Sequence, residues 1–402
     1  MPRVALDSRA AARWRRGHPW VYADGVLSVE EAAPGDVVLV HDAAGQALGQ
    51  AFFNPRSRIS LRRISFEQQS IDRDFWSCRL RAALERRAAL RTPQAGFRWV
   101  HADADGLPGL IVDVYDRSVV IQTLVLGADL LTHLWIELIE EILQPERIVL
   151  RNDPTVRALE GLPSDRTLVL GEGTSTEIRE AELCFTVDLW EGQKTGLFLD
   201  QRDNRMRMGE LAQGRCLDVF THQGGFAMHL AKQAKSVLAA DTSEPALARG
   251  REDALRNGLQ SKIAFECENA FDLLGNLDRQ GERFDVIVLD PPAFARSRKD
   301  LASARRGYGE INRRALRLLS EGGVLLTCSC SYNLPKEEFV EVVKRAAGEA
   351  RRSVRLLEDR GQPLDHPVLL ELPESRYLKG LLVQAADPPA SRSRSRNSPA
   401  DR

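Results

Sequence analysis

The hydrophobic and polar positions of this chain follow two different periods, and the period changes along the sequence. Up to about residue 66, short apolar runs such as Trp20-Val21-Tyr22 and Ala51-Phe52-Phe53 are broken by Gly and Pro. This pattern predicts a small β-barrel or sheet. From Asp74 to Arg91 the apolar residues take a helical spacing, and strands return from Leu110 to Tyr115. The middle of the chain is therefore expected to be α+β.

From about Leu183 onward, short apolar or β-branched strands alternate with helical segments. The expected strands cover 216–220, 237–241, 263–267, 284–290 and 323–329. Such alternation is typical of βαβ units on a largely parallel sheet, so the fold class is α/β. The predicted organisation is a barrel over 1–68, a central α+β domain over 69–180, a doubly wound domain over 181–386 and a disordered basic tail over 387–402.

Length and composition agree with several packed cores. At about 100 to 200 residues for each domain, 402 residues are too many for one, and 43% of them are hydrophobic. The first twenty residues lack the apolar core of a secretory signal, so a cytoplasmic location without membrane contact is expected. The six cysteines include no Cys-x-x-Cys pair. They predict neither a disulfide framework nor a metal site.

The distribution of charge is more informative than its total. A net charge of -1 does not point to a polyanionic partner. One segment is nevertheless strongly basic, and it contains Arg296, Arg298, Lys299, Arg305, Arg306, Arg313, Arg314 and Arg317 against Asp300 and Glu310. This segment is a candidate phosphate-binding face. A solvated helix explains the same composition.

The first strand of the α/β domain runs into a glycine turn, Gly224-Gly225, that is followed by a helical segment. In a doubly wound sheet such a turn lies at the carboxyl end of the strand, where glycines let the backbone approach a ligand. The next strand ends in Asp241, which can accept hydrogen bonds from ribose hydroxyls. Because the G-x-G-x-x-G pattern of pyrophosphate sites is absent, S-adenosylmethionine is favoured over NAD as the cofactor.

The fourth strand of this domain ends in a carboxylate. Asp290 is followed by Pro291, Pro292, Ala293 and Phe294, and the two prolines stiffen the loop. A rigid acid at the carboxyl edge of a sheet favours a chemical role over a simple strand cap.

At these positions the chain resembles the class I S-adenosylmethionine-dependent ribosomal RNA methyltransferases with an N-terminal PUA domain, specifically the single-cysteine cytosine-5 methyltransferases of the large-subunit RNA. The resemblance covers almost the whole chain. It is carried by His18-Pro19-Trp20-Val21-Tyr22, DGLPGLIVD over 105–113, GQKTGLFLDQRDNR over 192–205, the Gly224-Gly225-Phe226 turn, Asp290-Pro291-Pro292-Ala293-Phe294 and Ser329-Cys330-Ser331.

The resemblance implies a PUA barrel, a central α+β domain and a Rossmann-like catalytic domain. It implies that the S-adenosylmethionine pocket is lined by Lys194, Thr195, Phe198, Asp200, Arg202, Asp218, Gly224, Gly225, Asp241 and Asp290. One departure is Asn269, which stands where the family usually has an acid that contacts the adenine amino group. An amide oxygen can still accept that hydrogen bond.

Methylation of cytosine C5 needs a covalent step, because C5 is a poor nucleophile until a thiolate adds to C6. The fifth strand brings Cys328 and Cys330 to its end, and strand alternation places both on one face. Geometry leaves the choice open, and the resemblance selects Cys330. Asp290 is then the group expected to protonate or polarise N3 of the base.

The target base must leave its stack, and Phe294 or Tyr308 could stack on it. The RNA-binding residues expected with them are Arg13, Arg15, Arg16, Arg296, Arg305 and Arg306. The expected partner is large-subunit ribosomal RNA or a partly assembled large subunit, with no metal, and a homodimer is left open. Two other functions are compatible with the fold: methylation of a purine nitrogen, which needs no thiol, and a non-catalytic RNA-binding assembly factor.

Overall fold

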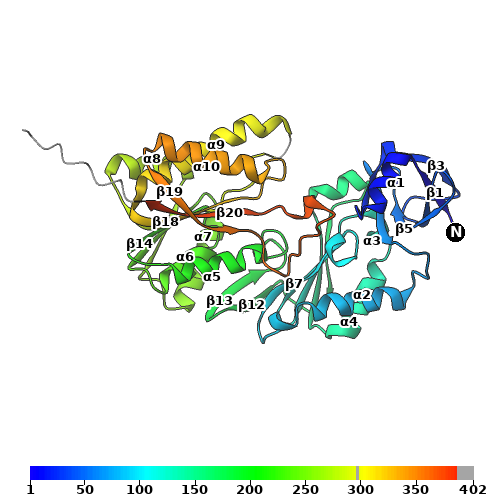
Figure 1. Ribbon diagram of the computed structural model, residues 1–402. Coiled ribbons are helices and arrows are strands. Elements are labelled where there is room, and N and C mark those ends of the chain that lie inside the picture. Colours follow the sequence, from blue (N-terminus) through cyan, green and yellow to red (C-terminus); the bar gives the residue numbers. More distant parts are fainter. Residues whose placement is uncertain (296–297, 387–402) are drawn as a thin grey trace, which may run out of the picture. The chain divides into compact units, whose positions relative to one another are not determined.

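A computed structural model describes residues 1–295 and 298–386 (Figure 1). Two compact units divide the chain. The first comprises residues 1–203 and 362–376, and the second comprises residues 204–361 and the chain from residue 377. The predicted domain boundary at 181 thus lies within the first unit, and the chain passes between the units three times.

The first unit begins with a six-stranded sheet that folds around its own small core. The order of its strands is β2 (Trp20–Tyr22), β6 (Ile59–Ser65), β5 (Ala47–Phe53), β4 (Val37–Asp42), β1 (Arg3–Leu6) and β3 (Val26–Glu30). Helix α1 (Ser8–Arg15) begins at Asp7, whose side chain accepts a hydrogen bond from the Ala10 amide. Its buried Trp14 packs in the core with Val4, Val38 and Leu61.

A second sheet of the same unit contains the middle of the chain. Its strands are β11 (Asp165–Leu170), β10 (Arg147–Asn152), β9 (Ser118–Thr123), β8 (Leu110–Tyr115) and β7 (Gly96–His101). The helices are α2 (Arg73–Glu85), α3 (Leu126–Asp129) and α4 (Thr132–Leu143), and a separate hairpin pairs β12 (Ser175–Glu180) with β13 (Leu183–Asp188). The stacked and edge-on rings of Phe52, Trp76 and Trp135 fill the core beside α2 and α4.

The second unit contains the predicted parallel sheet. Its strands follow the order β16 (Ile263–Cys267), β15 (Ser236–Asp241), β14 (Arg215–Val219), β17 (Phe284–Leu289), β18 (Leu319–Ser329), β20 (Lys379–Ala386) and β19 (Ser353–Arg360). The first five run parallel, and β20 is antiparallel to both of its neighbours. The order therefore reverses between β14 and β17, which is the switch point where ligands bind in open α/β sheets.

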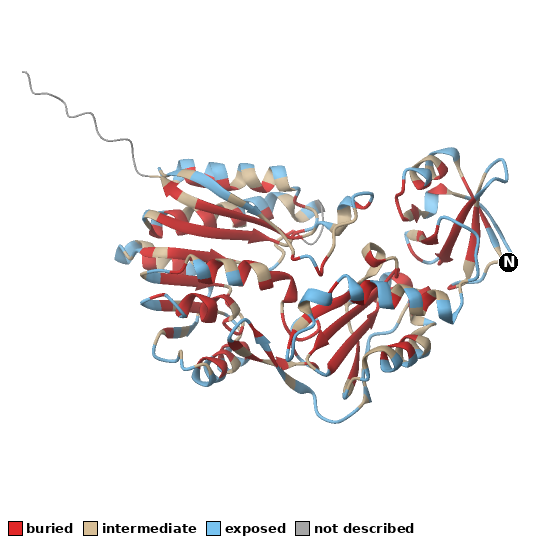
Figure 2. Ribbon diagram, turned by 60° about the horizontal axis from the view of Figure 1, so that its bottom comes forward, coloured by how far each residue is buried: buried red, intermediate tan, exposed pale blue. Residues whose placement is uncertain are grey.

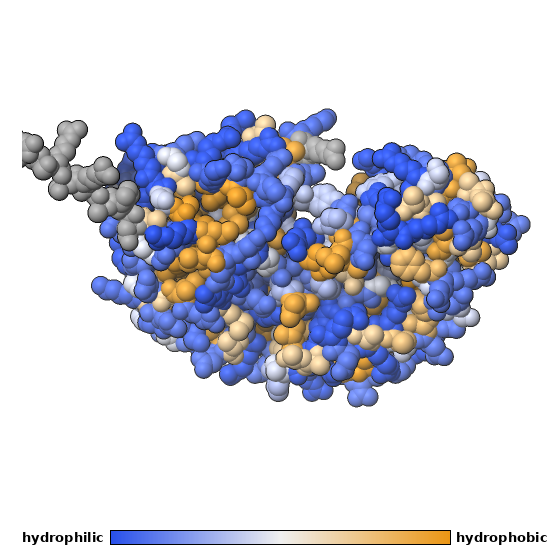
Figure 3. Space-filling view, in the orientation of Figure 1, coloured by the Kyte–Doolittle hydropathy of each residue, from blue (hydrophilic) through white to orange (hydrophobic). Residues whose placement is uncertain are grey.

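Helices cover both faces of this sheet (Figure 1). They are α5 (Arg202–Glu210), α6 (Gly225–Ala231), α7 (Glu244–Arg256), α8 (Ala270–Gln280), α9 (Leu301–Leu318) and α10 (Lys336–Glu349). Figure 2 shows buried strands between helices whose outer sides are exposed. In Figure 3, hydrophobic residues gather around β19 and β20, and on β19 Leu356 and Leu357 are exposed. Of the residues described, no helix combines the length and apolar character needed to cross a membrane.

The segment 362–376 returns to the first unit, where it places one carboxylate among buried cations. Asp365 is 1% exposed. It accepts hydrogen bonds from the Arg98 amide at 2.9 Å and from the Arg202 guanidinium at 3.0 and 3.2 Å. Burial alone would raise the pKa of Asp365, but His366 and Arg202 hold it well below its usual range.

We expect Asp365→Asn to lower the free energy of unfolding by about 3 to 5 kcal/mol, because it removes the buried carboxylate that pairs with the Arg202 guanidinium. The matched control is Asp203→Asn. Asp203 binds the same guanidinium at 3.0 Å but its side chain is 44% exposed, so the loss should stay below about 1 kcal/mol. Urea denaturation followed by tryptophan fluorescence measures both.

The same interaction has a pH signature. Because the folded pKa of Asp365 is depressed, its stabilisation is present above the ordinary aspartate pKa of about 4 and is lost as the pH falls below it. The Asp365→Asn variant should lose less stability over that acid range than the wild type. Equal acid losses in the two proteins would contradict this account.

Candidate active site

The glycine turn after β14 has an unusual backbone. Phe220, His222 and Gly224 all have positive φ angles, of 67°, 53° and 82°. Gly224 forms the N-cap of α6, and a Cβ built there would lie 2.9 Å from the Phe265 ring. Only glycine meets both demands without strain. The turn is therefore fixed at the carboxyl end of the first strand, as the sequence predicts.

Asp218, on β14, stabilises this turn through hydrogen bonds of its side chain. One carboxylate oxygen, Oδ2, accepts hydrogen bonds from the Thr221 hydroxyl and, at 2.9 Å, from the Ala227 amide. The other oxygen, Oδ1, is buried and has no hydrogen-bond partner among the described residues. Burial, together with the nearby carboxylates of Asp290 and Asp241, raises the pKa of Asp218 to about 7.

Asp241 ends β15, and Asn269 lies two residues after the end of β16. The two Asp241 oxygens accept hydrogen bonds at 2.9 Å from the backbone amides of His222 and Ser243. The Asn269 side chain is the N-cap of α8 and accepts from the Phe271 amide at 2.9 Å. Each oxygen has a second lone pair. Both residues thus stabilise their loops and still have acceptor capacity toward a ligand.

The second group of predicted residues meets where β17 and β18 end. Asp290 is half-buried at the end of β17, and the Cys330 thiol lies 3.9 Å from the carbonyl oxygen of Pro291, toward which it donates a weak hydrogen bond. The loop after Asp290 is attached to the same place by the Ala295 amide, which donates to the Ser331 hydroxyl at 3.1 Å. Cys330 is half-buried, whereas Cys328 is fully buried opposite Gly380 on β20.

Two aromatic residues near this place differ in exposure. Phe294 is half-buried and its ring lies 4.7 Å from that of Tyr308. Tyr308 is 0% exposed, and its hydroxyl is 3.0 Å from both Ser329 and Ser331 hydroxyls. Tyr308 therefore offers no face on which a base could stack, which corrects the expectation for this residue. Its ring supports Phe294 instead.

The segment 192–203 lies in the first unit, where its polar side chains bind their neighbours. The Thr195 hydroxyl donates to Asp113 at 2.6 Å and is 2.8 Å from the Tyr115 hydroxyl. Lys194 forms an ion pair with Asp200, and its ammonium lies 4.9 Å from the centre of the Phe198 ring. In the same unit Arg202 binds Asp365, as described above. These contacts fix the segment on β8 and on the segment 362–376.

Most arginines of the basic segment are paired with acids. Arg305 binds Glu338 at 2.6 Å, and Arg313 and Arg314 both bind Glu310. Arg306 is exposed, and no ion pair forms with it in the part of the chain described. Arg296 lies outside the described residues, as does the predicted tail 387–402. The segment is accordingly less available to phosphates than its composition indicates.

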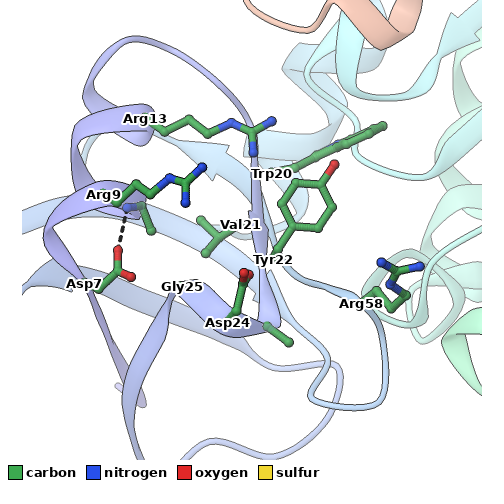
Figure 4. A pocket seen from close by; sticks show the side chains of 11 residues that line it. Asp7, Arg9, Arg13, Trp20, Val21, Tyr22, Asp24, Gly25 and Arg58 are labelled. Atoms are coloured by element: carbon green, nitrogen blue, oxygen red, sulfur yellow. Dashed lines mark hydrogen bonds between the residues drawn. The ribbon is translucent and has the colours of Figure 1, made fainter.

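The N-terminal sheet has a hollow of about 420 Å³ between α1 and β2. Figure 4 shows the guanidinium groups of Arg9, Arg13 and Arg58 around the ring of Tyr22. The Arg13 guanidinium lies 5.1 Å from the centre of that ring. Of the other arginines predicted here, Arg15 binds Asp42 and Arg16 is exposed, and neither lines the hollow. Arg58 and Tyr22 were not among the residues predicted to bind RNA.

Comparison with known proteins identifies the family to which the chain belongs. Residues 164–379 match the model of a family described as S-adenosylmethionine-dependent methyltransferase, and residues 4–66 match that of a PUA-like domain. The chain belongs to the S-adenosylmethionine-dependent methyltransferases. This confirms the α/β fold class, the PUA-like N-terminal part and the cofactor predicted from the sequence.

This methyltransferase has relatives that match nearly all of its length. Two of them, from Erwinia tasmaniensis and Aeromonas salmonicida, are named ribosomal RNA large subunit methyltransferase I. The first is 38% identical and covers 91% of this chain and 94% of its own. The second is 40% identical, with 92% and 96% covered.

Solved structures show the same fold. A putative S-adenosylmethionine-dependent methyltransferase from Streptococcus mutans superposes with a TM-score of 0.82, at 19% identity, over 96% of this chain and all of its own. A putative methyltransferase solved in complex with SAH superposes with a TM-score of 0.81, at 20% identity and with the same coverage.

The residues at the β14 turn fit the cofactor. S-adenosylmethionine carries ribose hydroxyls and an amino group, which are hydrogen-bond donors. The turn offers it the buried Asp218 Oδ1, which has no partner among the described residues, and the remaining lone pairs of Asp241. A donor in this place satisfies a buried acceptor that is otherwise costly. The geometry of the second unit therefore suits this ligand class.

The raised pKa of Asp218 leads to a test. The folded protein binds a proton here that the unfolded chain releases between about pH 4 and pH 7, so stability falls as the pH rises through that range. Asp218→Asn should remove this contribution, which is at most about 1.4 kcal/mol per pH unit. The difference in unfolding free energy between the two proteins, measured across the range without cofactor, should therefore change with pH. A constant difference would refute the assignment.

Proposed function

We propose that this methyltransferase transfers a methyl group to C5 of a cytosine in large-subunit ribosomal RNA, through a covalent adduct with Cys330. The observation that carries the proposal is the position of the Cys330 thiol beside the loop of Asp290, 3.9 Å from the Pro291 carbonyl oxygen. The relatives named ribosomal RNA large subunit methyltransferase I support the substrate class.

The chemistry explains why a thiol and an acid are both needed. The bound cofactor supplies an electrophilic methyl group. Cys330, as a thiolate, adds to C6 of the base, and the new bond places electron density on C5. Asp290 holds N3 and the exocyclic amine by hydrogen bonds and shares a proton with N3 as the thiolate adds. C5 then takes the methyl group, water accepts the C5 proton, and elimination of the thiolate from C6 restores Cys330.

The exposure of the two cysteines supports Cys330 over Cys328. Cys328 is 0% exposed and its sulfur lies against Gly380, so a base has no access to it. Cys330 follows the end of β18 and is half-buried. A nucleophile must be reached by its substrate, and only Cys330 of this pair meets that condition.

The cofactor assignments follow from the same proposal. Asp218, Gly224, Gly225, Asp241 and Asn269 bind S-adenosylmethionine at the β14 turn, where the two aspartates and Asn269 keep acceptor lone pairs. The resemblance adds Lys194, Thr195, Phe198, Asp200 and Arg202. The ion pairs of Lys194 and Arg202 suggest that these two act by fixing the segment 192–203.

The decisive experiment uses the two cysteines as a matched pair. Purified wild type, Cys330→Ala and Cys328→Ala are incubated with labelled S-adenosylmethionine and undermodified large-subunit RNA, and the product nucleoside is identified by mass spectrometry. We expect 5-methylcytidine from the wild type and from Cys328→Ala, and a loss of at least about a thousandfold in Cys330→Ala.

Other outcomes of this experiment would support one of the two alternative functions. A methylated purine formed equally by all three proteins would replace the thiol mechanism by nitrogen transfer. Cofactor binding without any product, on free RNA and on partly assembled particles alike, would favour an assembly factor that does not catalyse.

The same proposal assigns RNA binding to the hollow of the PUA-like part. Arg9 and Arg58 are exposed at its edge, and the Tyr22 ring lies between them (Figure 4). Guanidinium groups around an aromatic ring suit an unpaired nucleotide, since they bind the phosphate while the ring stacks on the base. Phosphate contacts of this kind hold and orient the RNA without reading its sequence.

The double variant Arg9→Gln/Arg58→Gln should bind the RNA more weakly, with the salt dependence of its affinity reduced by about one unit of slope for each lost contact. Arg15→Gln is the matched control, because Arg15 is engaged by Asp42 and lies outside the hollow. Fluorescence anisotropy at several salt concentrations measures all three proteins. If the double variant keeps the wild-type slope, the hollow does not bind phosphate.

A further inference from the structure

A buried lysine lies next to the turn that carries Cys330. Lys379 is the first residue of β20, where it pairs with Ser329 across the sheet, and it is 5% exposed. Its ammonium donates hydrogen bonds to the carbonyl oxygens of Ser331 at 2.7 Å and of Leu334 at 3.0 Å. The turn over 331–334 is closed by the Leu334 amide, which donates to the same Ser331 oxygen. Lys379 thus binds the turn directly after Cys330.

No carboxylate among the described residues forms an ion pair with the Lys379 ammonium, and the one described ionisable group that acts on it is the Cys330 thiol. Burying a cation costs free energy unless a counter-charge offsets the loss of solvent. Two carbonyl dipoles offset part of this cost. Within residues 1–295 and 298–386, the thiolate form of Cys330 supplies the further negative charge.

We propose that Lys379 is a positioning residue that stabilises Cys330 as a thiolate and fixes the turn that presents it. This role rests on the proposed function, in which Cys330 is the nucleophile. When the thiol ionises, its proton passes to water and the ammonium becomes the nearby positive charge. Lys379 touches neither base nor cofactor in this role, and it acts only through the thiol and the turn.

The other groups around Cys330 do not replace this charge. From α9, Tyr308 faces the thiol, but burial raises the pKa of its hydroxyl, so it is neutral near pH 7. From the end of β17, Asp290 would disfavour a thiolate. On β19, Arg360 packs near Gly380, but its guanidinium binds Glu358 and Asn204. Lys379 thus places a positive charge where it favours the ionised form of Cys330.

The state of Lys379 itself sets a limit on the effect. Burial lowers the pKa of its ammonium to about 8, and the negative charge of Cys330 acts in the opposite direction. Below that pH the lysine is charged and stabilises the thiolate. Above it the lysine loses its proton and the effect on the thiol disappears.

The test measures the ionisation of Cys330 without RNA. The full chain is alkylated with iodoacetamide across a range of about pH 5 to 10, and the rate at the Cys330 peptide is quantified by mass spectrometry. We expect the thiolate titration of Cys330 to move up by at least about one pH unit in Lys379→Gln, because the variant keeps an amide donor but removes the charge. Lys379→Arg, which keeps the charge, should titrate near the wild type.

Two controls keep the result interpretable. Cys78 is exposed, so in the same digest its rate reports changes in reagent or pH and should be equal in all variants. Unchanged affinity for S-adenosylmethionine shows that a variant is folded. An unshifted titration in folded Lys379→Gln overturns the proposal. If that variant does not fold, the wild type decides. A midpoint of the alkylation titration at Cys330 that equals or exceeds the midpoint at Cys78 overturns the proposal.

The outcome is separable from that of the proposed function. Alkylation requires neither substrate nor turnover, so a shifted titration together with a methylated purine as product would leave Lys379 as the partner of Cys330 and reject the cytosine mechanism. The reverse result, 5-methylcytidine formation with an unshifted titration, would retain the mechanism and reject the role of Lys379.

Discussion

One buried hydroxyl, that of Ser331, connects the loop after Asp290 with the end of β18. It accepts a hydrogen bond from the Ala295 amide, in the loop after Asp290, and lies 3.0 Å from the Tyr308 hydroxyl. This side chain therefore links the loop after Asp290 to the end of β18, which is followed by Cys330. Because buried hydroxyls are costly to leave unpaired, this link stabilises the folded arrangement of the two segments.

The sequence was sufficient to predict the parallel sheet of the second unit and the positions where its strands end. Asp218, Asp241 and Asp290 each stand at or near the end of an apolar run, and the carboxyl ends of parallel strands meet at one edge. The choice between Cys328 and Cys330 needed more. Alternation places both on one face, so the residues alone left the choice open and only the resemblance selected Cys330. The burial of Cys328 opposite β20 supports the same choice.

The remaining features depend on partners that are distant in the chain. Lys379 stands in an apolar strand, which marks it as unusual, but its contacts to Ser331 and Leu334 require the antiparallel pairing of β18 and β20. Tyr308 was expected to stack on a base because it lies close to Phe294 in the sequence. Sequence spacing does not show how deeply a side chain is buried. Likewise, composition alone counts the arginines of α9 as free cations, while the fold supplies Glu310 and Glu338 to pair with them.

The return of residues 362–376 to the first unit has a consequence for biosynthesis. A chain emerges from the ribosome from its N-terminus, and N-terminal domains usually fold first. Here Arg98 and Arg202 are synthesised long before Asp365. Strand β20 of the second unit is synthesised only after Asp365. Neither unit can therefore complete its native contacts until nearly the whole chain has been synthesised, and the two are expected to mature together.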